Sequence, residues 1–250
     1  MKSNNKLTNK NFWVSDNFQN YVFTNHEDSH GISMFIKKYI PPNVNGNCFE
    51  IGSFPGPFLS VFGKLGYTLN GVDFHPLNAL AVPNWLQSLG YSIGDFDEAD
   101  FFEYTTQKKY DVVASFGFIE HFVDYIDVIK RHAALVDNNG FICITTPNFK
   151  GRVQFWLHSF FDANNLAKHN INSMQPKKWA NILQSQGFEI IYQGYFGDFW
   201  FWHGNEKLPT WKNKLLWFFT RAINFTRKIL WFQSSAFSAY AGIVAKKNSF

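Results

Sequence analysis

The sequence has only two cysteines and no long apolar run, and both features narrow the class of protein. Cys48 and Cys143 stand in separate apolar segments, outside any spacing typical of metal sites, which favours a reducing, cytoplasmic setting. No run of 18 apolar residues free of charge occurs, so we expect no membrane-spanning helix. Residues 1–10 are polar and rich in Asn and Lys, and we therefore expect no signal peptide.

The net positive charge of the chain is confined to its C-terminal end. Residues 206–250 carry eight Lys or Arg against one acid, although the net charge of the whole chain is only +4. The basic character is therefore local, which indicates a basic element near the end rather than a nucleic-acid enzyme. No groove signature rich in Lys and Arg is present, and we expect no nucleic acid as a partner.

Short β-rich runs alternate with longer helical stretches from about residue 47 onward. This alternation predicts an α/β fold with a parallel sheet and helices on both faces. A periodic apolar stretch at 18–40, ended by Pro41 and Pro42, predicts a helical segment, so that residues 1–44 form an N-terminal helical cover. We expect seven strands, at 47–51, 67–73, 91–94, 110–116, 141–146, 188–195 and 240–246.

Aromatic residues are abundant, with 30 Phe, 9 Trp and 10 Tyr, and exceed what the core of one large domain usually holds. Some of them should therefore line a pocket or an interface. Two segments rich in Phe and Trp, at 150–175 and 197–239, stand outside the strand pattern. We predict that residues 45–250 form the main domain and that these two insertions form its helical aromatic cap.

A glycine-containing turn, Glu50–Gly56, follows the first predicted strand. Gly52 lets the backbone approach a ligand closely, and Gly56 permits tight packing where the next helix, expected at 57–66, begins. Asp73 ends the second predicted strand, where its carboxylate can accept hydrogen bonds from both hydroxyls of a ribose. The pattern predicts a nucleotide-type cofactor at the carboxyl ends of the strands.

Three further segments complete a resemblance to class I S-adenosylmethionine-dependent methyltransferases. Asp100 and Phe101 follow the third predicted strand, Phe118–Phe122 resembles the family's Leu-Glu-His stretch, and Leu135–Phe141 resembles its helix-to-strand turn. The resemblance implies a Rossmann-like, seven-stranded, mostly parallel sheet. It also implies S-adenosyl-L-methionine as the cofactor and S-adenosyl-L-homocysteine as the product. A nicotinamide-dependent Rossmann domain is the alternative, but the chain has no Gly-x-Gly-x-x-Gly run.

The resemblance also implies which residues contact the cofactor. The methionine and ribose would face the glycine turn and Asp73, the adenine would lie against an aromatic side chain and an acid at its edge, and backbone near the fourth strand would meet the ammonium group. The implied set is Glu50, Gly52, Ser53, Gly56, Asp73, Phe74, Asp100, Phe101 and Phe116, with Asp95 as an alternative to Asp100. Phe54 and Pro55 depart from the family's small residues, so the Phe54 side chain must point away from the methionine or pack beside it.

Methyl transfer is an in-line displacement, so alignment of the acceptor and exclusion of water supply much of its rate. A base is needed for a hydroxyl or protonated acceptor, and our catalytic candidates are His121, after the fourth strand, and His169, in the first cap segment. The alternative for each is a structural or solvated histidine. Glu120 and His121 resemble part of a metal site of some quinone O-methyltransferases, but Gly117 replaces the further carboxylate. We therefore predict no metal.

The pattern of polar and apolar side chains in residues 211–232 predicts an amphipathic helix. Lys214, Arg221, Asn224 and Lys228 recur at helical spacing, while Leu, Trp, Phe and Ile fill the rest of the circumference. Three interpretations stand open. The helix packs its apolar face on the sheet or cap, it forms a homodimer interface, or it holds the enzyme peripherally on an anionic membrane surface.

These features predict a methyltransferase that uses S-adenosylmethionine to methylate a small or lipid-linked molecule such as a sugar, a quinone or a natural-product intermediate. A hydroxyl is the favoured acceptor. The alternative, from a different class, is a protein or subunit that binds S-adenosylmethionine without catalysis.

Overall fold

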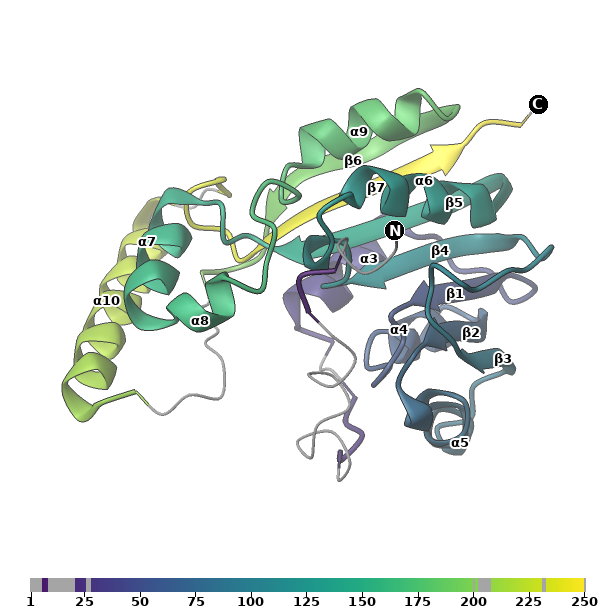
Figure 1. The fold of residues 1–250 in the computed structure, drawn as a ribbon, viewed down its shortest axis with the longest axis horizontal. Helices are drawn as coiled ribbons and strands as arrows, with labels where there is room; N and C mark the ends of the chain where they lie inside the picture. Colours follow the sequence, from purple (N-terminus) through teal and green to yellow (C-terminus); the bar gives the residue numbers. More distant parts are fainter. Residues whose placement is uncertain are drawn as a thin grey trace.

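The computed structural model describes residues 6–8, 21–25, 28–199, 201, 208–230 and 233–249 (Figure 1). Its centre is one sheet with the strand order β3-β2-β1-β4-β5-β7-β6. The strand β7 is antiparallel to both of its neighbours, whereas the pairs among β1 to β5 are parallel. The strands are β1 (Asn47–Ile51), β2 (Thr68–Asp73), β3 (Ile93–Glu98), β4 (Tyr110–Phe116), β5 (Val136–Pro147), β6 (Phe188–Phe196) and β7 (Tyr240–Lys247).

Helices cover both faces of the sheet, as Figure 1 shows. The helices on one face are α3 (Gly31–Tyr39), α4 (Leu59–Lys64) and α5 (Ala81–Ser88), and those on the other face are α6 (Tyr125–Leu135) and α9 (Pro176–Gln184). Alternate residues of a strand point to opposite faces, so Cys48 joins the apolar cluster of the first face and Phe49 that of the second. Both cysteines are buried and reduced. The expected three-layer α/β fold is confirmed.

The third strand lies later in the chain than predicted. It spans Ile93–Glu98 rather than 91–94, and its residues are mostly half-buried or exposed. The strand is at the edge of the sheet and carries acids on its solvent side, so its sequence lacks the apolar run that marks the other strands. As a consequence Asp95 lies within a strand, and Glu98 rather than Asp95 ends it.

The predicted helix at 18–40 is wrong over part of its length. The described residues 21–25 are not helical, and α3 begins only at Gly31. His30 defines this start, because its Nδ1 accepts a hydrogen bond from the backbone N of Ile32 at 3.3 Å. Before it, Phe23 stacks on Trp85 with 5.3 Å between ring centroids. The helix ends before the two prolines, as expected.

The two cap segments contain α7 (Arg152–Phe161) with α8 (Ala163–Leu166), and α10 (Thr210–Leu230). These helices lie together beyond one end of the sheet (Figure 1) and share a third apolar cluster. Its buried members are Leu157, Phe161, Phe199, Phe201 and Leu216. No helix in the part of the chain that the structure describes is long and apolar enough to cross a membrane.

Candidate active site

A pocket of about 700 Å³ opens where β1, β2 and β4 end at their carboxyl edge. The first strand lies between β2 and β4, so the strand order reverses there, which is the position where open α/β sheets bind ligands. The volume is in the range of small-molecule and cofactor sites. The lining includes seven of the residues predicted from the sequence: Gly52, Asp73, Phe74, Asp100, Phe101, Phe116 and His121.

The glycine turn after β1 brings bare backbone to this pocket. Gly52 has φ of +75°, and its N–H donates to the carbonyl of Val72 at 2.9 Å. A Cβ on Gly52 would lie 2.5 Å from Cδ2 of Phe118, so only glycine fits the turn. Gly56 has φ of +81° but does not line the pocket, because a Cβ there would meet Val82 instead. Gly56 therefore packs the turn against α5, and its predicted cofactor contact stays a prediction.

Phe54, the departure from the family pattern, forms a wall of the pocket. Its ring stacks on that of His75, with centroids 3.8 Å apart and planes within 2° of each other. Both residues line the cavity. His75 follows the end of β2 and caps the short 3₁₀ helix Pro76–Asn78, since its Nδ1 accepts from the backbone N of Leu77 at 3.1 Å. The aromatic pair was not predicted, although His75 stands only two residues after Asp73.

Asp73 ends β2 with both carboxylate oxygens turned to backbone donors. Oδ1 accepts from the N–H of His75 at 2.8 Å, and Oδ2 accepts from the N–H of Phe54 at 3.3 Å. Burial nevertheless raises the pKa of Asp73 to about 6, because desolvation outweighs these hydrogen bonds. The carboxylate therefore lies in the pocket at a cost in free energy, and a ligand with hydroxyl groups can supply the donors that it lacks.

Glu50 and Ser53 support the turn from behind rather than line the cavity. Ser53 Oγ donates to Oδ1 of Asn78 at 2.8 Å. Glu50 is buried, its Oε2 has no hydrogen-bond partner among the described residues, and burial together with the charge of Asp73 raises its pKa well above the usual range. A buried acid without a partner beside a cavity indicates a place for a polar or cationic ligand group. Direct contact of either residue with the cofactor stays a prediction.

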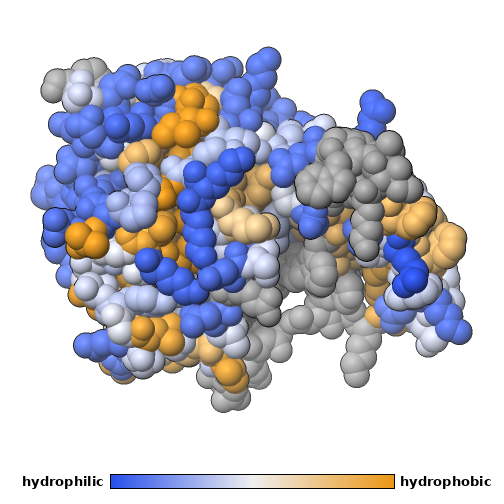
Figure 2. Space-filling view, turned by 180° about the vertical axis from the view of Figure 1, so that it is seen from behind, coloured by the Kyte–Doolittle hydropathy of each residue, from blue (hydrophilic) through white to orange (hydrophobic). Residues whose placement is uncertain are grey.

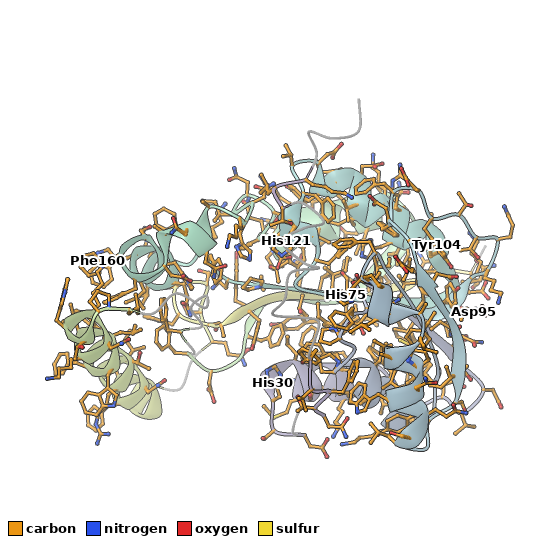
Figure 3. The ribbon with its side chains drawn as sticks, turned by 60° about the horizontal axis from the view of Figure 1, so that its bottom comes forward. His30, His75, Asp95, Tyr104, His121 and Phe160 are labelled. Carbon is orange, nitrogen blue, oxygen red and sulfur yellow. The ribbon has the colours of Figure 1, made fainter. Side chains whose placement is uncertain are left out.

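Asp100 follows the third strand and lines the pocket next to Lys6 of the N-terminal segment. Its carboxylate pairs with the ammonium of Lys6 and accepts from the N–H of Phe102 at 3.1 Å. Lys6 was not predicted for the site, because nothing in the sequence shows that the N-terminus returns to the third strand. Asp95, the alternative to Asp100, is half-exposed, pairs with Lys108 and lies outside the pocket. Figure 3 shows Asp95 far from His75 and His121.

The two catalytic candidates, far apart in the sequence, are neighbours in space. His121 ends the 3₁₀ helix Ile119–His121 after β4, and its ring centroid lies 4.7 Å from that of His169. Asn170 makes this arrangement, because its N–H donates to the carbonyl of Glu120 at 2.7 Å and its Nδ2 to the carbonyl of Phe122 at 2.9 Å. Of the two rings, only His121 lines the pocket.

Backbone carbonyls fix the tautomer of both imidazoles. Nδ1 of His121 lies 3.2 Å from the carbonyl of Lys168, and Nδ1 of His169 lies 2.8 Å from that of Asn165. A carbonyl can only accept, so each Nδ1 carries the proton and each Nε2 is the accepting nitrogen. Burial lowers the pKa of His121 to about 3 and that of His169 to about 4, so both rings are neutral at physiological pH.

Glu120 joins these histidines in a cluster that has the chemistry to hold a metal ion. Ligand atoms of Glu120, His121 and His169 lie within 4.8 Å of one another. Burial raises the pKa of Glu120 to about 8, so the acid is protonated near neutral pH, and a protonated acid is a poor metal ligand. Gly117 stands where a second carboxylate would complete the charge. The absence of a metal therefore stays a prediction, which an experiment below addresses.

A glycine turn after the first strand, an acid at the end of the second and a pocket at the reversal of strand order define an α/β enzyme that binds a nucleoside cofactor. The family of proteins described as "Methyltransferase domain" matches residues 24–193, which is more than half of the chain. The chain belongs to this family and is an S-adenosylmethionine-dependent methyltransferase. The predicted class and cofactor are confirmed.

Solved structures share this fold at low sequence identity. Magnesium protoporphyrin IX methyltransferase from Synechocystis, with bound S-adenosyl-L-homocysteine, is 14% identical with a TM-score of 0.50, covering 87% of this chain and 80% of that chain. The YcgJ protein from Bacillus subtilis is 11% identical with a TM-score of 0.51, covering 88% and 98%. The [4+2]-cyclase SpnF is 11% identical with a TM-score of 0.53, covering 88% and 80%. No curated protein matches the sequence.

The residues of the pocket fit S-adenosylmethionine. The cavity has the volume, Asp73 offers a carboxylate for the ribose hydroxyls, and Glu50 offers a buried oxygen without a partner among the described residues. Phe74 and Phe101 add apolar surface on which an adenine can lie. Of these residues, Asp73, Phe74 and Phe101 line the pocket and would hold the cofactor, whereas Glu50 lies behind the turn.

Proposed function

We propose that this methyltransferase methylates a hydroxyl group of a small or lipid-linked molecule, such as a sugar, a quinone or a natural-product intermediate. One observation carries the proposal. His121 lines the cofactor pocket, and the carbonyl of Lys168 holds the proton of its ring on Nδ1, so Nε2 is the nitrogen placed to accept the hydrogen bond and the proton of an acceptor hydroxyl. A hydroxyl needs such a base, whereas a neutral amine does not.

The residues of the chain divide the work of the reaction. Bound S-adenosylmethionine supplies an electrophilic methyl group on a sulfonium. Asp73 and the backbone at Gly52 would hold the cofactor, and His121 would orient the acceptor hydroxyl by accepting its hydrogen bond. Nε2 of His121 would take the hydroxyl proton as the acceptor oxygen gains the methyl group, while the electron pair of the broken carbon–sulfur bond would stay with the departing thioether.

His169 acts as a positioning residue in this proposal. It packs against His121 from the first cap segment, so the cap and the base are one unit. We assign the first cap segment to the acceptor side of the pocket through the contact of His169 with His121, and the N-terminal segment to the cofactor side through the contact of Lys6 with Asp100. The domain boundaries predicted from the sequence follow this division and remain part of the proposal.

The test measures release of S-adenosylhomocysteine from the purified chain with a panel of phenolic, sugar and lipid-linked hydroxyl acceptors. With an active acceptor, His121→Ala should lower kcat by about 100-fold, a typical contribution of a general base, and leave the Kd of S-adenosylmethionine unchanged. His169→Ala should lower kcat less, because it acts through His121. The control His30→Asn, at the N-cap of α3 and distant from the pocket, should be unchanged.

A second candidate function is binding of S-adenosylmethionine without methyl transfer. Phe54 favours it, because its bulk stands in the turn where the family has small residues and it forms a wall of the pocket. The same fold in a [4+2]-cyclase adds support. Tight binding of the cofactor in calorimetry together with no S-adenosylhomocysteine from any acceptor would favour this function. Full activity of His121→Ala would instead refute only the assigned base.

A further inference from the structure

The outer side of the cap exposes an unusual amount of aromatic surface. Seven aromatic side chains of α7 and α10 are each between 42% and 67% exposed. We call them the aromatic face: Phe155, Trp156, Phe160, Trp211, Trp217, Phe218 and Phe225. Packing of the apolar side of α10 on the cap, one of the three interpretations from the sequence, holds for part of that side: the described part of the helix buries Leu216 and packs Leu215, Phe219 and Ile223 partly. The remaining aromatic residues point to solvent.

Ring contacts connect the aromatic face across the two helices. Trp156 stacks on Phe160 with centroids 6.2 Å apart, and Phe160 meets Trp211 of the other helix at 6.3 Å. Trp156 also contacts Phe219 of α10 at 5.4 Å. Contiguous exposed apolar surface of this kind marks a site of interaction, whereas scattered apolar residues do not. Figure 3 shows Phe160 at the outer end of the molecule, away from the cofactor pocket.

Positive charge surrounds the aromatic face, and no acid occurs in α7 or α10. Nζ of Lys212 lies 4.9 Å from the ring centre of Phe160, and the guanidinium of Arg221 lies 5.4 Å from that of Trp217. Lys214 is exposed on the same helix. Figure 2 shows hydrophobic and hydrophilic surface side by side on the lobe that the cap forms. The surface thus combines aromatic rings with cations only.

We propose that the aromatic face docks on an anionic lipid surface. Aromatic rings partition into the boundary between headgroups and acyl chains, and Lys or Arg side chains reach from there to lipid phosphates. A helix that crosses no membrane but carries this pattern lies in the plane of the surface. Pairing of the face with a second copy would bring cations against cations without a compensating acid on either helix, which disfavours a homodimer through this surface.

Docking would also select the substrate. The cap that carries the aromatic face also carries His169 against His121, so the acceptor side of the pocket belongs to the lipid-bound part of the enzyme. This step rests on the proposed function and narrows it to an acceptor that resides in the membrane. Vesicle binding itself requires neither cofactor nor acceptor, so its failure is distinguishable from failure of the proposed activity.

The test is cosedimentation of the full chain with vesicles of phosphatidylcholine alone or with 30% phosphatidylserine, a composition about as anionic as a cytoplasmic leaflet. We expect binding to the anionic vesicles, weakened by salt, and little binding to the neutral ones. Removal of one cation near a lipid surface costs about fivefold in affinity. The double variant Lys214→Glu/Arg221→Glu should therefore lose more than 20-fold. The triple variant Trp217→Ser/Phe218→Ser/Phe225→Ser should lose at least tenfold.

Matched controls keep the test specific. Lys130→Glu/Lys177→Glu removes two exposed cations from α6 and α9, and Leu80→Ser removes an exposed apolar side chain near α5. These variants should bind vesicles like the parent, and all variants should keep its affinity for S-adenosylhomocysteine. Equal vesicle binding by the aromatic-face variants and the parent would overturn the proposal. A dimer in sedimentation velocity that the triple variant abolishes would overturn it in favour of a homodimer interface.

Discussion

The replacement Asp73→Asn should make the free protein more stable and its complex with the cofactor weaker. Burial raises the pKa of Asp73 from 3.8 to about 6, so ionisation of this group opposes folding, with a cost that grows between these two pH values and is constant above them. A shift of about two units corresponds to about 3 kcal/mol at pH 7.5 and about 1 kcal/mol at pH 4.5. The sign follows from the raised pKa, since stability from this group is present at low pH and falls as pH rises from about 4 to 6.

The observed gain will be smaller than this figure, for two structural reasons. Water in the pocket screens a carboxylate that is only half-buried, so we expect about half of the value. An asparagine also keeps one acceptor for the two backbone donors, the N–H of His75 and that of Phe54, and loses about 1 kcal/mol at the other. In urea unfolding the variant should therefore gain about 0.5 kcal/mol in free energy of unfolding at pH 7.5 and lose about 0.5 kcal/mol at pH 4.5.

The affinity of Asp73→Asn for S-adenosylhomocysteine should change in the opposite direction. Loss of a charged acceptor for ribose hydroxyls costs about 1.5–3 kcal/mol, or roughly 10- to 150-fold in Kd by calorimetry. Asp95→Asn is the matched control, because this acid lies on the neighbouring strand and outside the pocket. An unchanged Kd for Asp73→Asn would refute the role of this carboxylate, and a loss of stability at pH 7.5 would refute the assigned pKa.

Three further predictions concern the same site. Gly52→Ala should abolish cofactor binding in calorimetry and lower Tm, because φ of +75° and a Cβ only 2.5 Å from the Phe118 ring allow no side chain; binding at the parental Kd would contradict it. Cofactor affinity should fall as pH drops through about 6, when Asp73 takes up a proton, whereas kcat at saturating cofactor should show no acid limb from neutral His121 above pH 5. Activity should survive EDTA, and restoration of lost activity by Mg²⁺ or Zn²⁺ would instead assign a metal to Glu120, His121 and His169.

A strand was predicted well where burial on both faces leaves a short apolar run in its own sequence. Strands β1 and β4 are buried on both faces and therefore appear as short apolar runs. The edge strand β3 was placed too early, because its solvent-facing acids hide it. The N-terminal helix was predicted too long, because periodicity alone does not show that Phe23 would pack on Trp85 rather than continue a helix.

The parts of the active site also differ in how well neighbouring sequence predicts them. The residues expected to contact the cofactor lie in turns at strand ends, and such turns need particular residues at fixed spacing, so Gly52 and Asp73 could be placed at the pocket from neighbouring sequence. The rest of the site depends on contacts between segments that are separated in the sequence: Asn170 with Glu120, Lys6 with Asp100, and Phe54 with His75. None of these pairs has a sequence pattern that requires it. His121 and His169, which the sequence could only name as separate candidates, are brought together because Asn170 bonds to the backbone on both sides of His121. If His121 is the base and the aromatic face docks on lipid, as we propose, this one contact couples the location of the enzyme to the acceptor that it methylates.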